Sequence, residues 1–378
     1  METKRLYYVD WLRVLVVLSL IPYHAALTYL RFGTVYIKAP VSGLAALPFL
    51  AVVVPLGDFF MSLLFFASGI ASYYSFQKRG SGAYVRERAR KLMLPFLLGF
   101  LLLCPVVAYL QALYEGFSGG FLSFIPQFFG DGIIYYHGYG HLWFLFYLFI
   151  FSVLCVPIFN QWVRKESHIR RIGSFLSKGH HMLLPLGAIL LLELLLRPFF
   201  HGDQTLVFDW ANDAVYLSIF IFGYLFAAEE RIRNKLREYF KLSILCGMLS
   251  LAVLFYVNVR WQVMDSDEVY LTLLWVLAKG IYECSAIILL INGGRVYLNK
   301  NSKAVRYLNG ASFMVYIFHF LPVTFFTWLF IKLKLPIFIK FLLVVVLSYL
   351  AVFLMYELWR RVAALKERIS GKSNKHGR

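Results

Sequence analysis

The sequence of 378 residues has few charged residues and few cysteines. Only 15% of its residues are charged and 60% are hydrophobic, whereas soluble domains carry about a quarter charged residues. All four cysteines fall inside apolar runs, which favours buried free thiols over a disulfide framework. HExxH, CxxC, Walker and GxGxxG motifs are missing. The sequence therefore gives no support to a metal site or to nucleotide-hydrolysing and dinucleotide-binding functions.

Long uncharged runs recur along the whole chain. A lipid-crossing helix needs roughly 20 mostly apolar residues, so these runs indicate a surface that faces lipid rather than a soluble core. We predict an all-α transmembrane helix bundle of about ten spans, forming one integral membrane domain over residues 1–360 with a basic tail over 361–378. The predicted spans are 8–29, 48–76, 92–113, 141–160, 183–200, 213–229, 242–258, 270–292, 308–331 and 337–359.

The net charge of +18 is concentrated in short connectors between the apolar runs. Every second connector carries most of the lysines and arginines, as cytoplasmic loops do. This alternation predicts an even number of spans in a cell membrane with both termini in the cytoplasm, and it argues against nucleic acid as a partner. Lys4 and Arg5 resemble the start of a signal peptide, but Asp10 and Arg13 interrupt the apolar run that follows. We therefore expect an uncleaved first span.

The first predicted span carries three ionisable side chains on one helical face. Arg13 and His24 are eleven residues apart, close to three whole turns, and Asp10 precedes Arg13 by three residues. Ionisable groups within a span are costly, so each is a candidate functional residue. A purely structural alternative is also open, in which Asp10 and Arg13 reach toward the interface and His24 makes a hydrogen bond in the bundle.

Four more ionisable residues within predicted spans are candidates. Lys279 and Glu283 are spaced i, i+4, which suits either a self-satisfied ion pair or a functional site. Asp58 lies in the outer half of the second span, at about the depth of His24. His319 is a lone histidine on an apolar face of the ninth span, where a packed, hydrogen-bonded residue is the simpler interpretation.

Four segments, taken together, resemble one known family. They are YYVDWLR…YH at the start, MSLLFFASGIASYYSFQKRG leading into YVRERARKLMLPF, GHLWFLFYLFIF in the fourth span, and ASFMVYIFHFLP near the end. In this order, over residues 6–360, they resemble the acyltransferase 3 family of membrane acyltransferases. They are most similar to its glucan biosynthesis protein C branch.

The resemblance implies transfer of an acyl group, such as acetyl or succinyl, from cytoplasmic acyl-CoA to a hydroxyl of an extracytoplasmic carbohydrate. It implies acyl-CoA as a donor substrate, no permanently bound cofactor, and the lipid bilayer and a glycan acceptor as the other partners. By position, His24 matches the family's essential histidine, Arg13 its paired arginine, and Asp10 the acidic residue that opens the motif.

Further matches follow from the same resemblance. Arg88 and Lys91 match basic positions near the CoA donor, with Arg86 and Arg90 in the same run. The family usually has arginine where Lys91 stands, and lysine lacks the bidentate fork of arginine. The remaining matches are His141 and Trp143 in an HxW pattern, and Tyr316 and His319 in a Tyr-x-x-His pattern.

The chemistry of acyl transfer agrees with these residues. His24 could take the proton of an attacking hydroxyl or carry the acyl group itself. The connector from Lys78 to Lys91 would meet the CoA phosphates, and Arg13 could hold the donor or stabilise an oxyanion. A secondary transporter or flippase is the alternative, because it too keeps charges within the bilayer, although no inverted repeat is detectable. The sequence leaves open the oligomeric state, the acyl group and the glycan.

Overall fold

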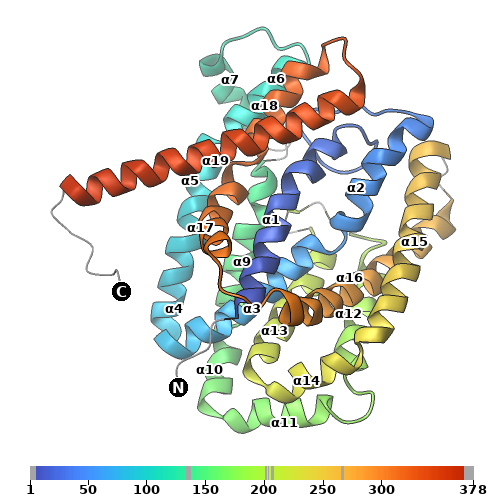
Figure 1. The fold of residues 1–378 in the computed structure, drawn as a ribbon, viewed down its shortest axis with the longest axis vertical. Coiled ribbons are helices and arrows are strands. Elements are labelled where there is room, and N and C mark those ends of the chain that lie inside the picture. The colour runs from blue at the N-terminus through green and yellow to red at the C-terminus, as the bar shows by residue number, and fades with distance from the viewer. Residues whose placement is uncertain are drawn as a thin grey trace.

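The described part of the chain is built from helices joined by short connections (Figure 1). The computed structural model describes residues 6–369, except 133–137, 201, 203, 206–207 and 265–267. The helices are α1 (Tyr7–Leu27), α2 (Leu47–Gly57), α3 (Phe60–Arg79), α4 (Ser81–Arg88), α5 (Leu94–Leu102), α6 (Cys104–Tyr114), α7 (Phe121–Gln127), α9 (Trp143–Leu154), α10 (Val156–Arg164), α11 (Glu166–Leu176), α12 (Leu183–Leu196), α13 (Trp210–Ala228), α14 (Glu230–Glu238), α15 (Phe240–Met264), α16 (Val269–Tyr297), α17 (Lys303–Phe318), α18 (Phe320–Ile331) and α19 (Ile337–Ile369). Single turns are η1 (Gly43–Ala46), η2 (Ala89–Met93), η3 (Phe128–Gly132) and η4 (Gly140–Leu142).

Seven helical segments of the described chain are long and apolar enough to cross a membrane, or up to nine if each of two bent helix pairs is one span. The bent pairs are α9–α10, with an angle of 45°, and α17–α18, with an angle of 56°. The prediction of an all-helical, multi-span bundle is confirmed for these residues, whereas the count of ten and the side of the termini stay predictions. The predicted span 183–200 corresponds to α12, whose 14 residues extend about 21 Å, less than the roughly 30 Å of a bilayer core.

Other predicted spans differ from the helices in where they break and end. The span predicted at 48–76 is interrupted between α2 and α3, and Asp58 caps the end of α2. The span predicted at 92–113 belongs to a helical run that begins earlier, at Ser81, directly after a turn at Gly80 with φ +72°. α19 extends beyond the predicted limit at 359 into the basic tail, and residues 370–378 lie outside the described residues.

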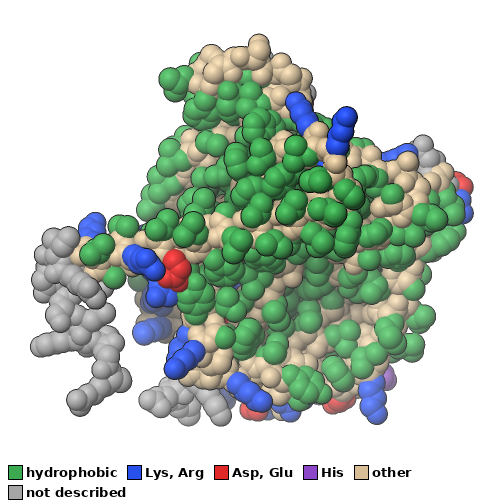
Figure 2. Space-filling view, turned by 45° about the horizontal axis from the view of Figure 1, so that its top comes forward, with side chains coloured by type: hydrophobic (Ala, Val, Ile, Leu, Met, Phe, Trp, Pro, Cys, Tyr) green, Lys and Arg blue, Asp and Glu red, His purple; other side chains and the backbone are tan. Residues whose placement is uncertain are grey.

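The bundle has two unlike ends (Figure 1). α4, α11 and α14 lie toward the lower end, and α7 and the turn between α18 and α19 lie at the upper end. Figure 2 shows a broad hydrophobic face, with most of its Lys and Arg along the lower edge. Leu98 and Leu102 of α5 are 50% and 65% exposed, as expected of side chains that face lipid. We call the end with α4, α11 and α14 the basic end.

α3 and α13 pack against each other through two glycines. A Cβ atom added at Gly69 would collide with the carbonyl oxygen of Phe220, and one added at Gly223 would collide with the carbonyl oxygen of Phe66. Small residues allow transmembrane helices to approach until their backbones touch. Because α3 forms a wall of the site described next, this crossing fixes the position of that wall.

Candidate active site

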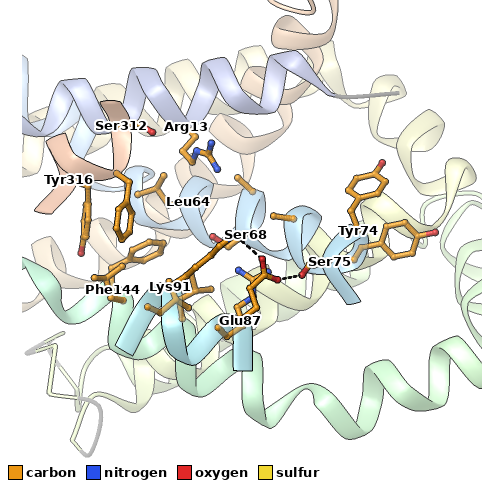
Figure 3. Close-up of a pocket in the computed structure, with 18 of the residues that line it drawn as sticks. Arg13, Leu64, Ser68, Tyr74, Ser75, Glu87, Lys91, Phe144, Ser312 and Tyr316 are labelled. Carbon is orange, nitrogen blue, oxygen red and sulfur yellow. Dashed lines mark hydrogen bonds and ion pairs between the residues drawn. The ribbon is translucent and has the colours of Figure 1, made fainter. Parts of the chain in front are cut away.

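A cavity of about 1320 Å³ lies within the bundle, lined by α1, α3, α4, α9 and α17 and by η2 (Figure 3). Pockets for drug-sized ligands measure about 300–1,000 Å³, so this cavity has room for a longer molecule. The lining changes character along its length. Lys78, Arg79, Glu87, Arg88 and Lys91 line one part, and Arg13, Phe144, Asn309, Ser312 and Tyr316 line another.

α3 supplies a wall that passes from apolar to basic. Leu64, Ser68, Ala71, Ser75 and Lys78 line the cavity from this helix, and their spacing places them on one face. The small side chains in the middle of the row leave space beside the backbone. The turn at Gly80 then reverses the chain, so α4 and η2 bring their cations back toward the end of α3.

Glu87 contacts two of the cations at the mouth of this cavity, which is its part lined by Lys78, Arg79, Arg88 and Lys91 (Figure 3). Its carboxylate accepts hydrogen bonds from Lys91 Nζ at 2.8 Å and from Ser75 Oγ at 2.6 Å, and it lies 3.3 Å from Arg79 Nη2. Four cations and this one carboxylate are among the residues that line the mouth. The excess of positive charge suits an anionic ligand such as a phosphate.

Two of the four basic residues predicted to bind the donor line the cavity. Arg88 donates to Ser72 Oγ at 3.2 Å and its guanidinium lies 4.9 Å from the centre of the Tyr84 ring. Lys91 lies in η2, a π-helical turn, and such turns are frequent at functional sites. Arg86 and Arg90 are exposed and are not among the lining residues. Lys78 and Arg79 take part instead, although the sequence indicated them only as charges of the connector.

α1 and α17 run side by side and bring predicted residues together at two levels. At the first level Arg13 lies 3.3 Å from Asp10 and donates a hydrogen bond to Asn309 of α17. At the second level the ring centres of His24 and His319 are 5.3 Å apart. The predicted row of Asp10, Arg13 and His24 on α1 therefore contacts a second row of polar residues on α17, Asn309 and His319 at its end.

His141 joins His24 and His319 in a cluster of three imidazoles. Its ring centre is 4.9 Å from that of His319, and Tyr316 donates its hydroxyl proton to the His141 carbonyl at 2.5 Å. His141 Nε2 bonds to the Ile317 carbonyl at 2.8 Å, and His319 Nδ1 bonds to the Tyr316 carbonyl at 2.7 Å. Because a carbonyl oxygen can only accept, each of these ring nitrogens carries the proton.

The bend between α17 and α18 explains this arrangement. The last carbonyls of a helix have no partner within it, and those of Tyr316 and Ile317 accept from the two imidazoles instead. The opposite nitrogen of His319, Nε2, is buried, as is Nδ1 of His24. Neither has a hydrogen-bond partner among the described residues. Buried polar atoms are normally satisfied, so these two nitrogens are suited to a substrate group that lies between them.

The family is decided by comparison with known proteins. A family model for an acyltransferase domain matches residues 6–357, nearly the whole chain. The chain belongs to the acyltransferase 3 family. No curated protein and no solved structure matches it. Family membership shows an acyl-transferring enzyme, and the multi-span helices show that it is a membrane acyltransferase.

Several predicted residues are not among those that line the large cavity, namely Asp10, His24, His141, His319, Trp143 and Asp58. Trp143 is buried against Tyr147 and Tyr216, with ring centres 5.0 and 5.9 Å away, so it packs in the core behind the site. Asp58, at the break between α2 and α3, lies within electrostatic range of Tyr23 and Lys279. Asp58 therefore lies between the neighbourhood of His24 and a buried ion network.

That ion network includes the predicted pair Lys279–Glu283 but is larger. Lys279 Nζ lies 3.6 Å from Glu283 and 2.5 Å from Glu193 of α12. Arg197 binds Glu193 with two hydrogen bonds of 2.8 and 2.9 Å, and Ser62 of α3 donates to Glu283. All four charged side chains are at most 8% exposed. The self-satisfied pair is thus only part of the network, because the closer partner of Lys279 comes from α12.

The network continues toward the start of α13. Arg197 donates to Asn212 at 2.9 Å, Asn212 donates to Asp209 at 2.9 Å, and Tyr147 donates to Asp209 at 2.7 Å. Burial raises the pKa of Asp209, while the bonds from Tyr147 and Asn212 and the charge of Arg197 oppose this rise. The sequence analysis missed Glu193 and Asp209 and did not single out Arg197, although Glu193 and Arg197 have the same i, i+4 spacing as the pair that it found.

Proposed function

We propose that this enzyme transfers an acyl group from acyl-CoA to a hydroxyl of a carbohydrate acceptor, with His24 as the general base. One observation carries the proposal. A single cavity leads from the cations of α3, α4 and η2 to Arg13 and Tyr316. The Tyr316 hydroxyl donates a hydrogen bond to the carbonyl of His141, which belongs to the histidine cluster. The donor would enter at the basic mouth and present its thioester toward the histidines.

The charges and the shape of the cavity support CoA as the donor. The phosphates of CoA need several cations, and Arg88, Lys91, Lys78 and Arg79 line the mouth. The narrow, uncharged pantetheine arm suits the row of small side chains along α3. Arg13 lies farther inside, held by Asp10 and Asn309, where it can bind the thioester oxygen as negative charge develops.

The reaction needs a group that takes a proton and later returns it. His24 takes the proton of the acceptor hydroxyl as the hydroxyl oxygen bonds to the thioester carbonyl carbon. The carbon–sulfur bond then breaks, and the thiolate of CoA receives the proton from the His24 imidazolium. The His319 ring centre lies 5.3 Å from that of His24 and its Nε2 has no hydrogen-bond partner among the described residues, so this nitrogen can accept a hydrogen bond from the acceptor and orient it.

The proposal also assigns sides to the bundle. We take the basic end as cytoplasmic, following the charge bias of the connectors, so that both termini are cytoplasmic and the acceptor arrives from the opposite side. The resemblance to the glucan biosynthesis protein C branch supports a glycan acceptor and an acetyl or succinyl donor. We favour acyl transfer over the transporter alternative, because family membership shows an acyl-transferring enzyme.

The test is acyl-CoA turnover by the purified protein in nanodiscs. His24→Ala is expected to reduce transfer by about 10²–10⁴-fold, because a general base contributes about that much. The apparent affinity for acyl-CoA should change little, because the base acts on the transition state. His180→Ala removes an exposed histidine in the connection between α11 and α12 and is the matched control. Residual His24→Ala activity above a tenth of the wild-type value would rule out His24 as the base.

A further inference from the structure

A second cavity, of about 650 Å³, lies at the basic end between α1, α14 and α16. Three arginines line it, Arg233 and Arg237 from α14 and Arg295 from α16, and no acidic residue of the described chain does so. Tyr8, Phe240 and Val296 supply apolar surface beside them. We propose that this cavity binds the phosphate headgroup of an anionic phospholipid. We call it the three-arginine cavity.

Two of the three guanidinium groups are held by backbone carbonyls, and no carboxylate of the described residues neutralises any of the three. Arg233 donates to the carbonyls of Phe226 and Ala227, at 3.0 and 2.7 Å, at the end of α13. Arg295 donates to the carbonyl of Arg233 at 3.4 Å. No carboxylate of the described residues lies within ion-pair distance of the three side chains; Glu230 acts on Arg295 only through space. Three like charges converging on one cavity repel one another, and an anion between them removes that repulsion.

The space beside these charges is kept open by a glycine. A Cβ atom added at Gly293, in the last third of α16, would meet nothing within 4 Å. Glycine weakens the interior of a helix, yet here its missing side chain leaves the cavity its volume. Gly294, its neighbour, instead packs against Tyr8 of α1. The electrostatic field of the three arginines also acts on the Tyr8 hydroxyl.

The position of the cavity favours a lipid over a soluble anion. α15 begins at Phe240 and α16 ends at Tyr297, and both are candidate membrane spans, so the cavity lies where the two spans meet the basic end. Val296 and Tyr297 are 69% and 75% exposed, which provides apolar contact for acyl chains. Basic cavities between transmembrane helices on the cytoplasmic side are known to hold anionic lipid headgroups. A free phosphate would leave this apolar lining in contact with water.

The experiment measures lipid binding to the full-length, delipidated protein by native mass spectrometry. Phosphatidylglycerol and phosphatidylcholine with identical acyl chains are titrated in parallel. We expect one phosphatidylglycerol to bind at least tenfold more tightly than phosphatidylcholine. Arg237→Gln with Arg295→Gln should weaken it about thirtyfold, because each arginine near an anionic headgroup contributes about fivefold. Arg233 is left unchanged because it also holds the end of α13.

Matched variants separate the site from general surface charge. Arg231→Gln with Arg306→Gln removes two exposed arginines that do not line the cavity, and it should leave the lipid preference unchanged. Gly293→Leu fills the cavity without altering charge and should weaken binding at least tenfold. Gly187→Leu, at another helical glycine with nothing within 4 Å, should not. Unaltered size-exclusion profiles verify that each variant is folded.

Three results would overturn the proposal. The first is equal binding of the two lipids by the wild-type protein, and the second is equal loss of binding in the variants and their controls. The third is displacement of phosphatidylglycerol by inorganic phosphate or acyl-CoA, which would assign the three-arginine cavity to a soluble anion. Because the measured quantity is lipid binding rather than transfer, failure here leaves the proposed acyltransferase function intact.

Discussion

Glu87 restrains two cations at the mouth of the large cavity, so neutralising it tests whether those cations bind the donor. In the structure its carboxylate lies 2.8 Å from Lys91 and 3.3 Å from Arg79, whose side chains are 68% and 38% exposed. Exposed ion pairs of this kind contribute about 0.2–1 kcal/mol each. Glu87→Gln releases both cations and removes one negative charge that repels phosphate. We expect the KM for acyl-CoA to fall roughly two- to tenfold at low salt, since about 1.4 kcal/mol corresponds to tenfold.

The assay is steady-state transfer in nanodiscs, with acyl-CoA varied at low and high salt. kcat should stay the same, because the change affects ground-state and transition-state binding alike. The decrease in KM should disappear at about 1 M salt, where the Debye length is roughly 3 Å. Glu166→Gln is the control, because Glu166, like Glu87, pairs with a cation at i+4, in this case Arg170 at 2.9 Å, but lies outside the cavity. An unchanged or higher KM for Glu87→Gln, or an equal decrease for Glu166→Gln, would refute the assignment of the mouth to the donor.

Two further predictions concern the donor and the fold. Arg88→Gln with Lys91→Gln should raise the KM for acyl-CoA, and part of this increase should depend on the salt concentration. Arg86→Gln with Arg90→Gln should not raise the KM, because these two exposed side chains do not line the cavity. Equal increases in KM for the two double variants at low salt would assign all four charges to general electrostatic attraction. Gly69→Ala should lower the thermal unfolding midpoint, because the added Cβ collides with a backbone carbonyl and such overpacking costs about 1–3 kcal/mol. Gly187→Ala, where a Cβ meets nothing, should not lower it, and a Gly69→Ala protein as stable as the wild type would contradict the close crossing of α3 and α13.

The sequence predicted the long helices well and their interruptions poorly. The predicted spans 8–29 and 270–292 correspond to α1 (Tyr7–Leu27) and α16 (Val269–Tyr297), because a run of about 20 apolar residues is a local property. The bend at His319 and the break at Asp58 depend on which side chains pack against the freed backbone. The sequence of one apolar segment does not show which side chains from other segments will pack there, so the bend and the break could not be predicted from it.

The site was predictable only where its residues share a helix. Helical spacing was enough to place Arg13 and His24 on one face of α1. The meeting of His141 with His319 joins segments that are far apart in the chain, and only the family resemblance singled out both. The contact of Lys279 with Glu193 spans 86 residues of sequence, and no local pattern could indicate which acidic residue would be the partner.

The buried ion network constrains the order in which the chain can settle in the bilayer. α12 is only 14 residues long and carries Glu193, and a charge at the middle of a membrane helix costs about 2.5–3.5 kcal/mol on insertion scales. Arg197 offsets part of this cost at once, because it follows on the same helix. Lys279, the second partner of Glu193, leaves the ribosome 86 residues later. Glu193 therefore gains its second cationic partner only after α16 has been made, so a buried charge of the earlier half of the chain depends on a residue of the later half.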